Sequence, residues 1–303
     1  MNSTSSSTLS LDTLVGLKVY KLRTRLIVDQ RKSFQLLHTH TRAFIKYTTT
    51  TTMLAYTPLV KRYISSFQLF TFRILDMIRV APAHKLKSLL YAEVGFLLRL
   101  NCILIYPESK DEQINRLLEW FQTLSDKLRL EDVKEAYIDT LQQLNLSLLD
   151  PQKYLFSFTT IWDTIHLMAY MGDAMVVKRD VVKHDTVMLY MQNLKWVFYN
   201  LFIVLFCPKC ARHYLTANIF VYEIERVEVA LYRERLGEPI IMVQEETRSM
   251  ATKNCLMTHH LLYKSMQFHN HVNGYRPIQS NAPDMNNFQR MEWSVYKNML
   301  GIV

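Results

Sequence analysis

The sequence contains few of the residues that interrupt helices. Its 303 residues include only 6 glycines and 8 prolines, the two residue types that most strongly break α-helices. No segment shows the sustained alternation of apolar and polar residues that is typical of a half-buried β-strand. These absences favour long helices, and the sequence predicts an all-α architecture.

A long apolar run and an export signal are also missing. The most apolar stretch, residues 196–206, is 11 residues long, about half of the ~20 residues that a helix needs to cross a bilayer. The first ten residues are rich in serine and threonine and lack the basic-then-apolar order of a secretory signal. We therefore expect a disordered polar tail at residues 1–10, no membrane span and no secretion.

The chain has more basic than acidic residues, but the basic residues are not concentrated in one segment. The chain has 36 Lys and Arg against 27 Asp and Glu, a formal net charge of +9. A basic surface binds nucleic acid in a salt-dependent way. Here the basic residues are scattered, and their densest group, within residues 18–32, has the spacing of a solvated helix face. We expect this surface to steer acidic partners at most, without specific nucleic-acid binding.

Cysteine is scarce, because the chain contains 4 in total. That number excludes a disulfide scaffold in a protein that is not exported. Cys102 lies in an apolar helical stretch, and we interpret it as a buried inert thiol. Cys255 lies in the helical pattern that leads to His269, where it is either a free core thiol or a resolving partner, and we favour the core thiol. The other two belong to one short motif, Cys207-Pro208-Lys209-Cys210.

The C-x-x-C motif has two interpretations. If a helix begins here with Pro208 at its first position, the Cys207 sulfur lies at the positive end of the helix dipole. That position lowers the pKa of a thiol, which favours a redox centre. The alternative is a zinc-stabilised helical interaction or structural protein, in which the zinc ligands would be Cys207, Cys210, His213 and either Cys255 or His259. Structural zinc sites usually have a second close ligand pair, and none follows at the expected spacing.

Two further segments carry polar and aromatic groups at helical spacing. Trp162, His166 and Tyr170 are separated by four residues each, so they share one face of a helix. Taken alone, such a stripe is more typical of a core than of a cofactor site. The segment His269–Asn273 ends a helical pattern that starts near Val243, and taken alone it is typical of a helix C-terminal cap.

In order along the chain, these segments read W-x-x-x-H, C-x-x-C-x-x-H-[FY] and H-N-x-V-N. The combination resembles the Erv/ALR family of FAD-dependent sulfhydryl oxidases. The resemblance implies a bundle of four helices plus a short extra helix, with FAD as cofactor and no metal. It implies an enzyme that introduces disulfide bonds into proteins, passing electrons from dithiols through Cys207–Cys210 to FAD and then to O2, with H2O2 as product.

The resemblance also implies roles for individual residues. Cys207 would exchange with substrate thiols, and Cys210 would pass electrons to the flavin. The residues implied in FAD binding are Trp162, His166, Tyr170, His213, His269, Asn270, Val272, Asn273 and Arg276. Of these, Tyr170 and His213 are equally compatible with ordinary packing, and Arg276 is slightly displaced from the family's basic residue. The family's basic residue before the tryptophan is replaced by Thr159-Thr160-Ile161, and we interpret the threonines as a helix N-cap.

The spacing between the motifs and the length of the segment before them indicate one group within this family. Cys210 and His269 are 59 residues apart, with an inserted stretch at about residues 221–253, and a long helical segment precedes the motifs. This organisation resembles the sulfhydryl oxidases of baculoviruses and related large insect DNA viruses. It implies a homodimer, thiol-containing viral proteins as substrates, location in the host cytoplasm or nucleus or in the virion, and an N-terminal domain that is a degenerate, flavin-free copy of the oxidase bundle.

A domain boundary is expected at Asp150-Pro151, because a residue before proline avoids the helical conformation. It divides the chain into an N-terminal helical domain, residues 11–150, and an oxidase domain, residues 151–303. Helical patterns cover residues 11–30, 33–47, 58–80, 84–105, 111–128 and 131–147 before the boundary, and residues 152–171, 180–205, 208–234, 243–271 and 284–299 after it.

Overall fold

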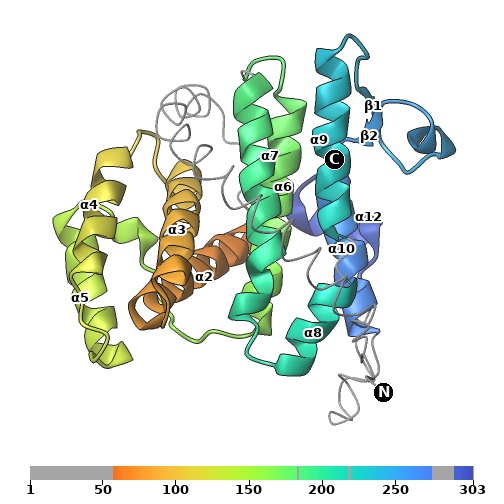
Figure 1. Ribbon diagram of the computed structural model, residues 1–303. Helices are drawn as coiled ribbons and strands as arrows, with labels where there is room; N and C mark the ends of the chain where they lie inside the picture. Colours follow the sequence, from red (N-terminus) through yellow and green to blue (C-terminus); the bar gives the residue numbers. More distant parts are fainter. Residues whose placement is uncertain (1–56, 183, 218–219, 275–289, 303) are drawn as a thin grey trace, which may run out of the picture. The chain divides into compact units, whose positions relative to one another are not determined.

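The computed structural model describes residues 57–182, 184–217, 220–274 and 290–302 (Figure 1). Helices dominate this part of the chain, which confirms the all-α prediction. The α-helices are α2 (Pro58–Val80), α3 (His84–Ile105), α4 (Asp111–Gln122), α5 (Leu130–Gln143), α6 (Phe158–Val177), α7 (His184–Asn200), α8 (Pro208–Ala217), α9 (Phe220–Arg235), α10 (His260–Asn273) and α12 (Trp293–Leu300). Short 3₁₀ turns lie at Ser147–Leu149, Leu201–Val204 and Arg248–Ala251.

The first described helices begin and end where the sequence predicts. Thr57 is the N-cap of α2, and its hydroxyl accepts a hydrogen bond from the backbone N–H of Val60 at 3.2 Å. Pro58 occupies the first helical position, where its missing N–H breaks no hydrogen bond. Helix α2 then ends shortly before Pro82, which cannot continue it. The predicted tail at residues 1–10 and the predicted helices at residues 11–30 and 33–47 lie outside the described residues.

Helix α6 is the central element of the bundle. It packs most extensively on α2 and α10, while α7 packs on α9 (Figure 1). Its Asp173 carboxylate accepts the backbone N–H groups of Leu261 and Leu262, both at 2.9 Å. These N–H groups belong to the first turn of α10, where they have no partner inside the helix. A side chain of α6 therefore caps α10 and fixes the two helices side by side.

The predicted helix over residues 243–271 is wrong in its first half. The structure has strand β1 (Ile241–Val243) paired in parallel with strand β2 (Cys255–Met257), and α10 begins only at His260. Val243, Met250 and Met257 recur every seven residues, which is a helical period. In the structure they meet in a small apolar cluster with Cys255, so tertiary packing overrides the local pattern.

Helix α6 begins later than the sequence predicted. Its N-cap is Ser157, and the expectation that the threonines at 159 and 160 cap the helix is corrected. The Ser157 hydroxyl accepts the Thr160 N–H at 3.4 Å, while the Thr160 hydroxyl accepts the Ser157 N–H at 3.2 Å. This reciprocal pair is a capping box, in which the third residue of the helix completes the cap.

The remaining predicted helices agree with the structure in position and differ in their ends. The pattern at residues 208–234 corresponds to α8 and α9, and the pattern at residues 180–205 to α7 with a following 3₁₀ turn. Helix α2 packs on α6 across the predicted boundary at Asp150-Pro151. The division into two domains and the origin of the first as a degenerate copy stay predictions.

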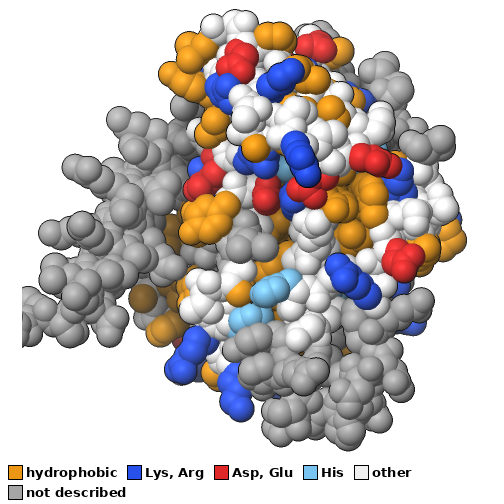
Figure 2. All heavy atoms as spheres, turned by 90° about the vertical axis from the view of Figure 1, so that its right-hand side faces the viewer, with side chains coloured by type: hydrophobic (Ala, Val, Ile, Leu, Met, Phe, Trp, Pro, Cys, Tyr) orange, Lys and Arg blue, Asp and Glu red, His pale blue; other side chains and the backbone are white. Residues whose placement is uncertain are grey.

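Helix α3 is the one described helix that is long and apolar enough to cross a membrane. Of its most apolar window, 61% is buried inside the protein, which is typical of a core helix. Figure 2 shows the side of the molecule that carries α9, α10 and the strands. Acidic and basic side chains are interspersed on this face.

Helix α3 also buries a carboxyl group that should make stability depend on pH. Glu93 is 2% exposed, and burial raises its pKa from 4.5 to about 8. Between these two values the folded protein keeps a proton that the unfolded chain has released. The contribution of Glu93 to the free energy of unfolding should therefore be largest below pH 4.5 and fall as the pH rises toward 8. Thermal unfolding of the wild type and of Glu93→Gln over this pH range should show a smaller decline of stability with pH in the variant. Parallel declines in the two proteins would contradict the role of Glu93.

Candidate active site

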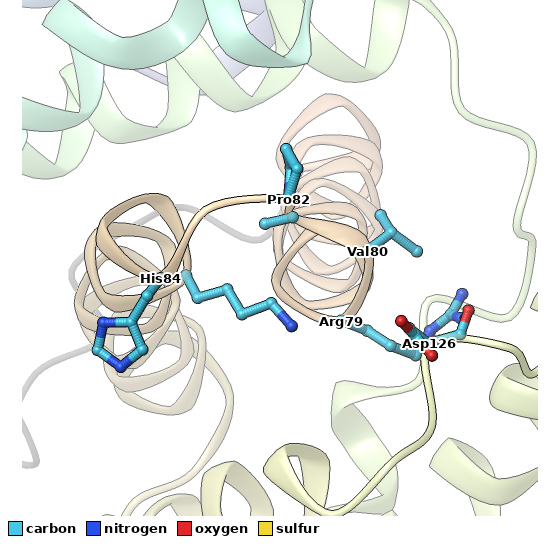
Figure 3. Close-up of a pocket in the computed structure, with 7 residues that line it drawn as sticks. Arg79, Val80, Pro82, His84 and Asp126 are labelled. Atoms are coloured by element: carbon cyan, nitrogen blue, oxygen red, sulfur yellow. The ribbon is translucent and has the colours of Figure 1, made fainter.

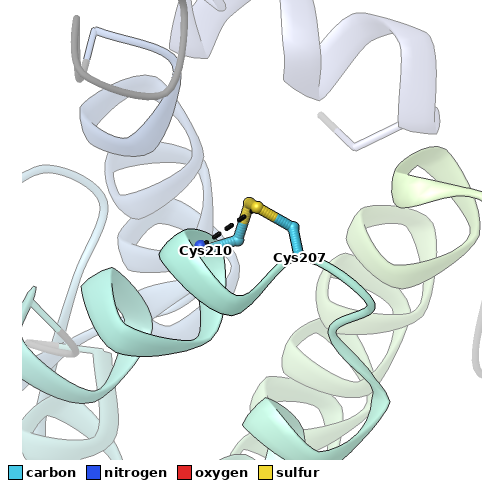
Figure 4. Close-up of a disulfide and its surroundings, with 2 residues drawn as sticks. All are labelled: Cys207 and Cys210. Carbon is cyan, nitrogen blue, oxygen red and sulfur yellow. Dashed lines mark hydrogen bonds between the residues drawn. A yellow bond between two sulfur atoms is a disulfide. The ribbon is translucent and has the colours of Figure 1, made fainter.

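Cys207 and Cys210 form a disulfide at the N-terminus of α8, with their Cα atoms 5.1 Å apart. Pro208 is the first residue of the helix, as predicted, and the Cys207 carbonyl accepts the N–H of Ala211 at 2.9 Å. The Cys210 N–H points at the Cys207 sulfur, at 3.2 Å (Figure 4). Because the positive end of the helix faces this sulfur, reduction of the disulfide leaves Cys207 in a position that favours the thiolate.

Trp162, His166 and His269 form an aromatic cluster between α6 and α10. The rings of Trp162 and His269 are parallel within 8°, with centroids 3.9 Å apart. The His166 ring lies 6.0 Å from Trp162 and 5.2 Å from His269. The structure therefore brings together residues from the W-x-x-x-H and H-N-x-V-N segments, which are about 100 residues apart in the chain.

A hydrogen-bond chain fixes the two histidine rings. The Ser265 hydroxyl donates to the Leu262 carbonyl at 2.7 Å, so its oxygen accepts from His166 Nδ1 at 2.8 Å. Burial lowers the pKa of His166 well below its ordinary value and that of His269 to about 4. Both rings are therefore neutral at pH 7, and His166 Nε2 accepts the Nδ1 proton of His269 at 2.9 Å. This chain orients the His269 ring against Trp162.

Helix α2 supports the same cluster from the N-terminal half. The Arg62 guanidinium donates to both carboxylate oxygens of Asp163, at 3.0 and 2.9 Å, and the Ser66 hydroxyl donates at 2.8 Å. Asp163 follows Trp162 directly on α6. Tyr63 lies against the His166 ring, with centroids 6.0 Å apart. The orientation of Trp162 and His166 thus depends on a helix that carries none of the predicted site residues.

The Arg62–Asp163 pair should stabilise the packing of α2 on α6. The Asp163 side chain is 4% exposed, so Asp163→Asn should lower the free energy of unfolding by about 1.5–3 kcal/mol, the range for hydrogen bonds to a charged group. The exposed pair Arg129–Asp132 has the same two-bond geometry, and Asp132→Asn should have no measurable effect. Urea denaturation of both variants compares their free energies of unfolding. Equal denaturation midpoints would contradict a stabilising role for the Arg62–Asp163 pair.

His213 and Tyr170 occupy different parts of the bundle. His213 is buried on α8, and its ring lies 5.9 Å from that of His271 at the end of α10. Burial lowers the pKa of His213 below its ordinary value. The disulfide helix is therefore in contact with the H-N-x-V-N segment. Tyr170 instead contacts His259 at the start of α10, with centroids 5.9 Å apart.

The H-N-x-V-N segment contains both engaged and unpaired polar groups. The Asn270 amide donates to the Met291 carbonyl and accepts the Met291 N–H, both at 2.9 Å, so it holds the segment before α12. Val272 is half-buried. The Asn273 Nδ2 group is buried and has no hydrogen-bond partner among the described residues. An unpaired buried donor one helical turn after His269 on α10 suits a cofactor with oxygen and nitrogen acceptors. Arg276 lies outside the described residues.

Sequence reasoning missed several residues that surround the cluster. Tyr63 of α2 and Tyr296 of α12 share a buried hydrogen bond at 3.0 Å, and both rings face His166. Phe268 packs edge-on against Trp162 at 5.7 Å. Only Phe268 had a usable signal, since it precedes His269 in a motif that was already identified. The tyrosines lie on helices that are distant in sequence, and nothing local marks them.

The two other cysteines are buried and free, as predicted. Burial raises the pKa of Cys102 to about 12, and Cys255 lies in β2 within the small apolar cluster. Within the described parts of the chain, no group of three or more His, Cys, Asp or Glu side chains could hold a metal ion. The zinc interpretation therefore has no support in the geometry around the disulfide.

A cavity of about 500 Å³ lies where α2 ends and α3 begins (Figure 3). Arg79, His84, Lys87 and Asp126 are among the residues that line it. Arg79 is held by the Asp76 carboxylate at 2.8 Å and by the Asp126 carbonyl at 2.7 Å. None of the predicted site residues lines this cavity, so we do not assign it to the redox site.

Comparison with known proteins identifies the family. Residues 57–302 match the family described as Baculovirus P33. The chain is 34% identical over 258 residues to the FAD-linked sulfhydryl oxidase of Autographa californica nuclear polyhedrosis virus, covering 82% of this chain and 100% of that protein. It is 31% identical over 282 residues to the 33 kDa early protein of Orgyia pseudotsugata multicapsid polyhedrosis virus, with the same coverage. The chain belongs to the Baculovirus P33 family, as the resemblance to baculovirus proteins predicted.

Proposed function

We propose that this protein is a FAD-dependent sulfhydryl oxidase that introduces disulfide bonds into other proteins. The observation that carries the proposal is the Cys207–Cys210 disulfide at the N-terminus of α8, a helix that reaches the H-N-x-V-N segment through His213 and His271. The named activity of the relative from Autographa californica nuclear polyhedrosis virus, which aligns over its full length, supports the same function.

The chain's own residues perform the thiol–disulfide exchange. A substrate thiolate attacks the Cys207 sulfur, the Cys207–Cys210 bond breaks, and Cys210 leaves as a thiolate. The second substrate thiol then attacks the mixed disulfide, which releases the oxidised substrate and the Cys207 thiolate. The Cys210 N–H and the positive end of α8 stabilise this leaving group. The substrate loses two electrons, and the cysteine pair gains them.

Trp162, His166, His269 and Asn273 would hold FAD. The parallel rings of Trp162 and His269 offer flat aromatic surface, and Asn273 offers an unpaired donor. Neutral histidines suit this role, because a planar, uncharged imidazole can stack without bringing a charge into a buried site. FAD, when bound, supplies the two-electron acceptor that regenerates the disulfide and passes the electrons to O2, which yields H2O2.

Partners and location belong to the same proposal. The substrates would be thiol-containing viral proteins, and the site of action the host cytoplasm or nucleus, or the virion. A homodimer is supported by exposed apolar residues on α9 and directly after its end, three of which recur at the seven-residue spacing of a helix seam. These three are Tyr222, Val229 and Leu236, and Tyr232 is a further exposed apolar residue of α9.

An absorbance spectrum of the purified protein tests the function. We expect a flavin spectrum, and oxygen uptake with H2O2 release when dithiothreitol is added. Extraction of the flavin and its identification as FAD completes the test. A colourless protein that neither consumes oxygen nor binds added FAD would contradict the proposal.

A further inference from the structure

Two aromatic side chains lie exposed beside the disulfide. Phe206 directly precedes Cys207 and is 59% exposed, and Phe158, the first residue of α6, is 37% exposed. Their rings contact each other, with centroids 4.3 Å apart. Exposed aromatic rings that pair with each other form a contiguous apolar surface, and such surfaces mark interaction sites. We call Phe206 and Phe158 the aromatic platform.

The platform lies where a substrate chain must pass. In a mixed disulfide the Cα atoms of the two joined cysteines are about 4.4–6.8 Å apart. The residue beside Cys207 is about 3.8 Å from it along the chain, so the neighbours of a substrate cysteine come within side-chain reach of Phe206. Phe158 extends the surface toward the cofactor cluster, because Trp162 is one turn further along the same face of α6.

Helix α8, which begins at the disulfide, adds positive charge beside it. It carries Lys209 and Arg212, both exposed, and no acidic residue. Neither cation forms an ion pair with an acidic side chain within the described part of the protein. A protein substrate that approaches Cys207 therefore meets an apolar surface together with uncompensated positive charge, and complementary charge raises association rates and selects partners.

We propose that the aromatic platform and the two cations of α8 form the docking site for the substrate polypeptide. The preferred occupant is an extended segment with a large apolar side chain next to its reacting cysteine and with acidic residues that face α8. The inference rests on the proposed oxidase function and deepens it, because it assigns a substrate class to the same site. Small dithiols have no side chains for these residues to contact.

Two reduced peptides test the preference. Each contains a pair of cysteines; one has phenylalanine beside the first cysteine and glutamates after it, and the other has serine and lysines at the same places. For each variant, kcat/KM for each peptide is divided by kcat/KM for dithiothreitol, which normalises for the integrity of the disulfide. The wild type should favour the first peptide. Phe206→Ala and Phe158→Ala should each reduce that preference at least about fivefold, as expected for an interface residue that contributes 1 kcal/mol or more.

Charge reversal and matched controls complete the design. Arg212→Glu should reduce the preference in the same way, while Arg116→Glu on α4 and Val181→Ala at an exposed apolar position between α6 and α7 should leave it unchanged. A wild type without preference, or a preference that survives in all platform and Arg212 variants, would overturn the docking site. A platform variant that elutes as a smaller species in gel filtration would show a contact between subunits and would also overturn it. A wild type that does not oxidise dithiothreitol would instead refute the oxidase function itself.

Discussion

Replacement of Cys207 or Cys210 by serine is expected to reduce dithiol-driven oxygen consumption by more than about 1,000-fold, because the disulfide that the substrate thiolate attacks is lost. A serine hydroxyl can neither form the mixed disulfide nor receive the two electrons of the substrate. FAD content should remain that of the wild type, since the residues that would hold FAD are Trp162, His166 and His269, and the substitutions leave all three in place. Oxygen-electrode turnover and absorbance spectra of both variants measure the two effects.

The chain provides matched controls for these substitutions. Cys102 and Cys255 are the other cysteines, and both are buried and free. Cys102→Ala and Cys255→Ala should keep wild-type turnover once the amount of folded protein is matched. If either control were inactive while folded, or if Cys207→Ser retained turnover, the electrons would enter the protein by another route.

Loss of the Trp162 ring is expected to release the cofactor. Alanine substitution of an aromatic side chain that stacks on a nucleobase costs about 1–3 kcal/mol, which corresponds to a rise of about 5- to 150-fold in Kd. Trp162→Ala also removes the parallel contact that holds His269, at 3.9 Å between centroids. The flavin-to-protein absorbance ratio after dialysis measures how much FAD the variant retains. Titration of the variant with FAD gives the Kd.

Trp120 provides a matched control for Trp162→Ala, because both substitutions remove a tryptophan ring. It lies half-buried on α4, and its ring contacts Phe121 at 5.7 Å. Trp120→Ala should leave FAD retention unchanged, even if it lowers stability. Equal loss of FAD in both variants would attribute the effect to general unfolding, and unchanged retention in Trp162→Ala would remove the aromatic cluster from the cofactor site.

Much of the fold could be predicted from local sequence. The bounds of α2 and α3 follow from Pro58, Pro82 and an otherwise unbroken helical pattern, and scarce glycine leaves few places for a helix to end. The paired strands β1 and β2 could not be predicted in the same way. Three residues are too few to show alternation, and their pairing joins Ile241 to Cys255 across an intervening loop.

The candidate site shows the same division between local and distant information. The stripe of Trp162 and His166 and the C-x-x-C motif at a helix start are local patterns, and the structure places them as their spacing indicates. The bonds from Arg62 and Ser66 to Asp163 join residues that are 101 and 97 positions apart. No helical or strand period relates such residues, so the contribution of α2 emerges only from the packing of α2 on α6.

Anaerobic reduction of the bound flavin by dithiothreitol, followed in a stopped-flow spectrophotometer, tests the role of the disulfide most directly. If the Cys207–Cys210 pair carries the electrons, the flavin of the wild type should bleach within the time of one turnover. The flavin of Cys207→Ser should remain oxidised on that timescale, although the cofactor is present in equal amount. Equal rates of bleaching in the two proteins would contradict electron transfer through this disulfide.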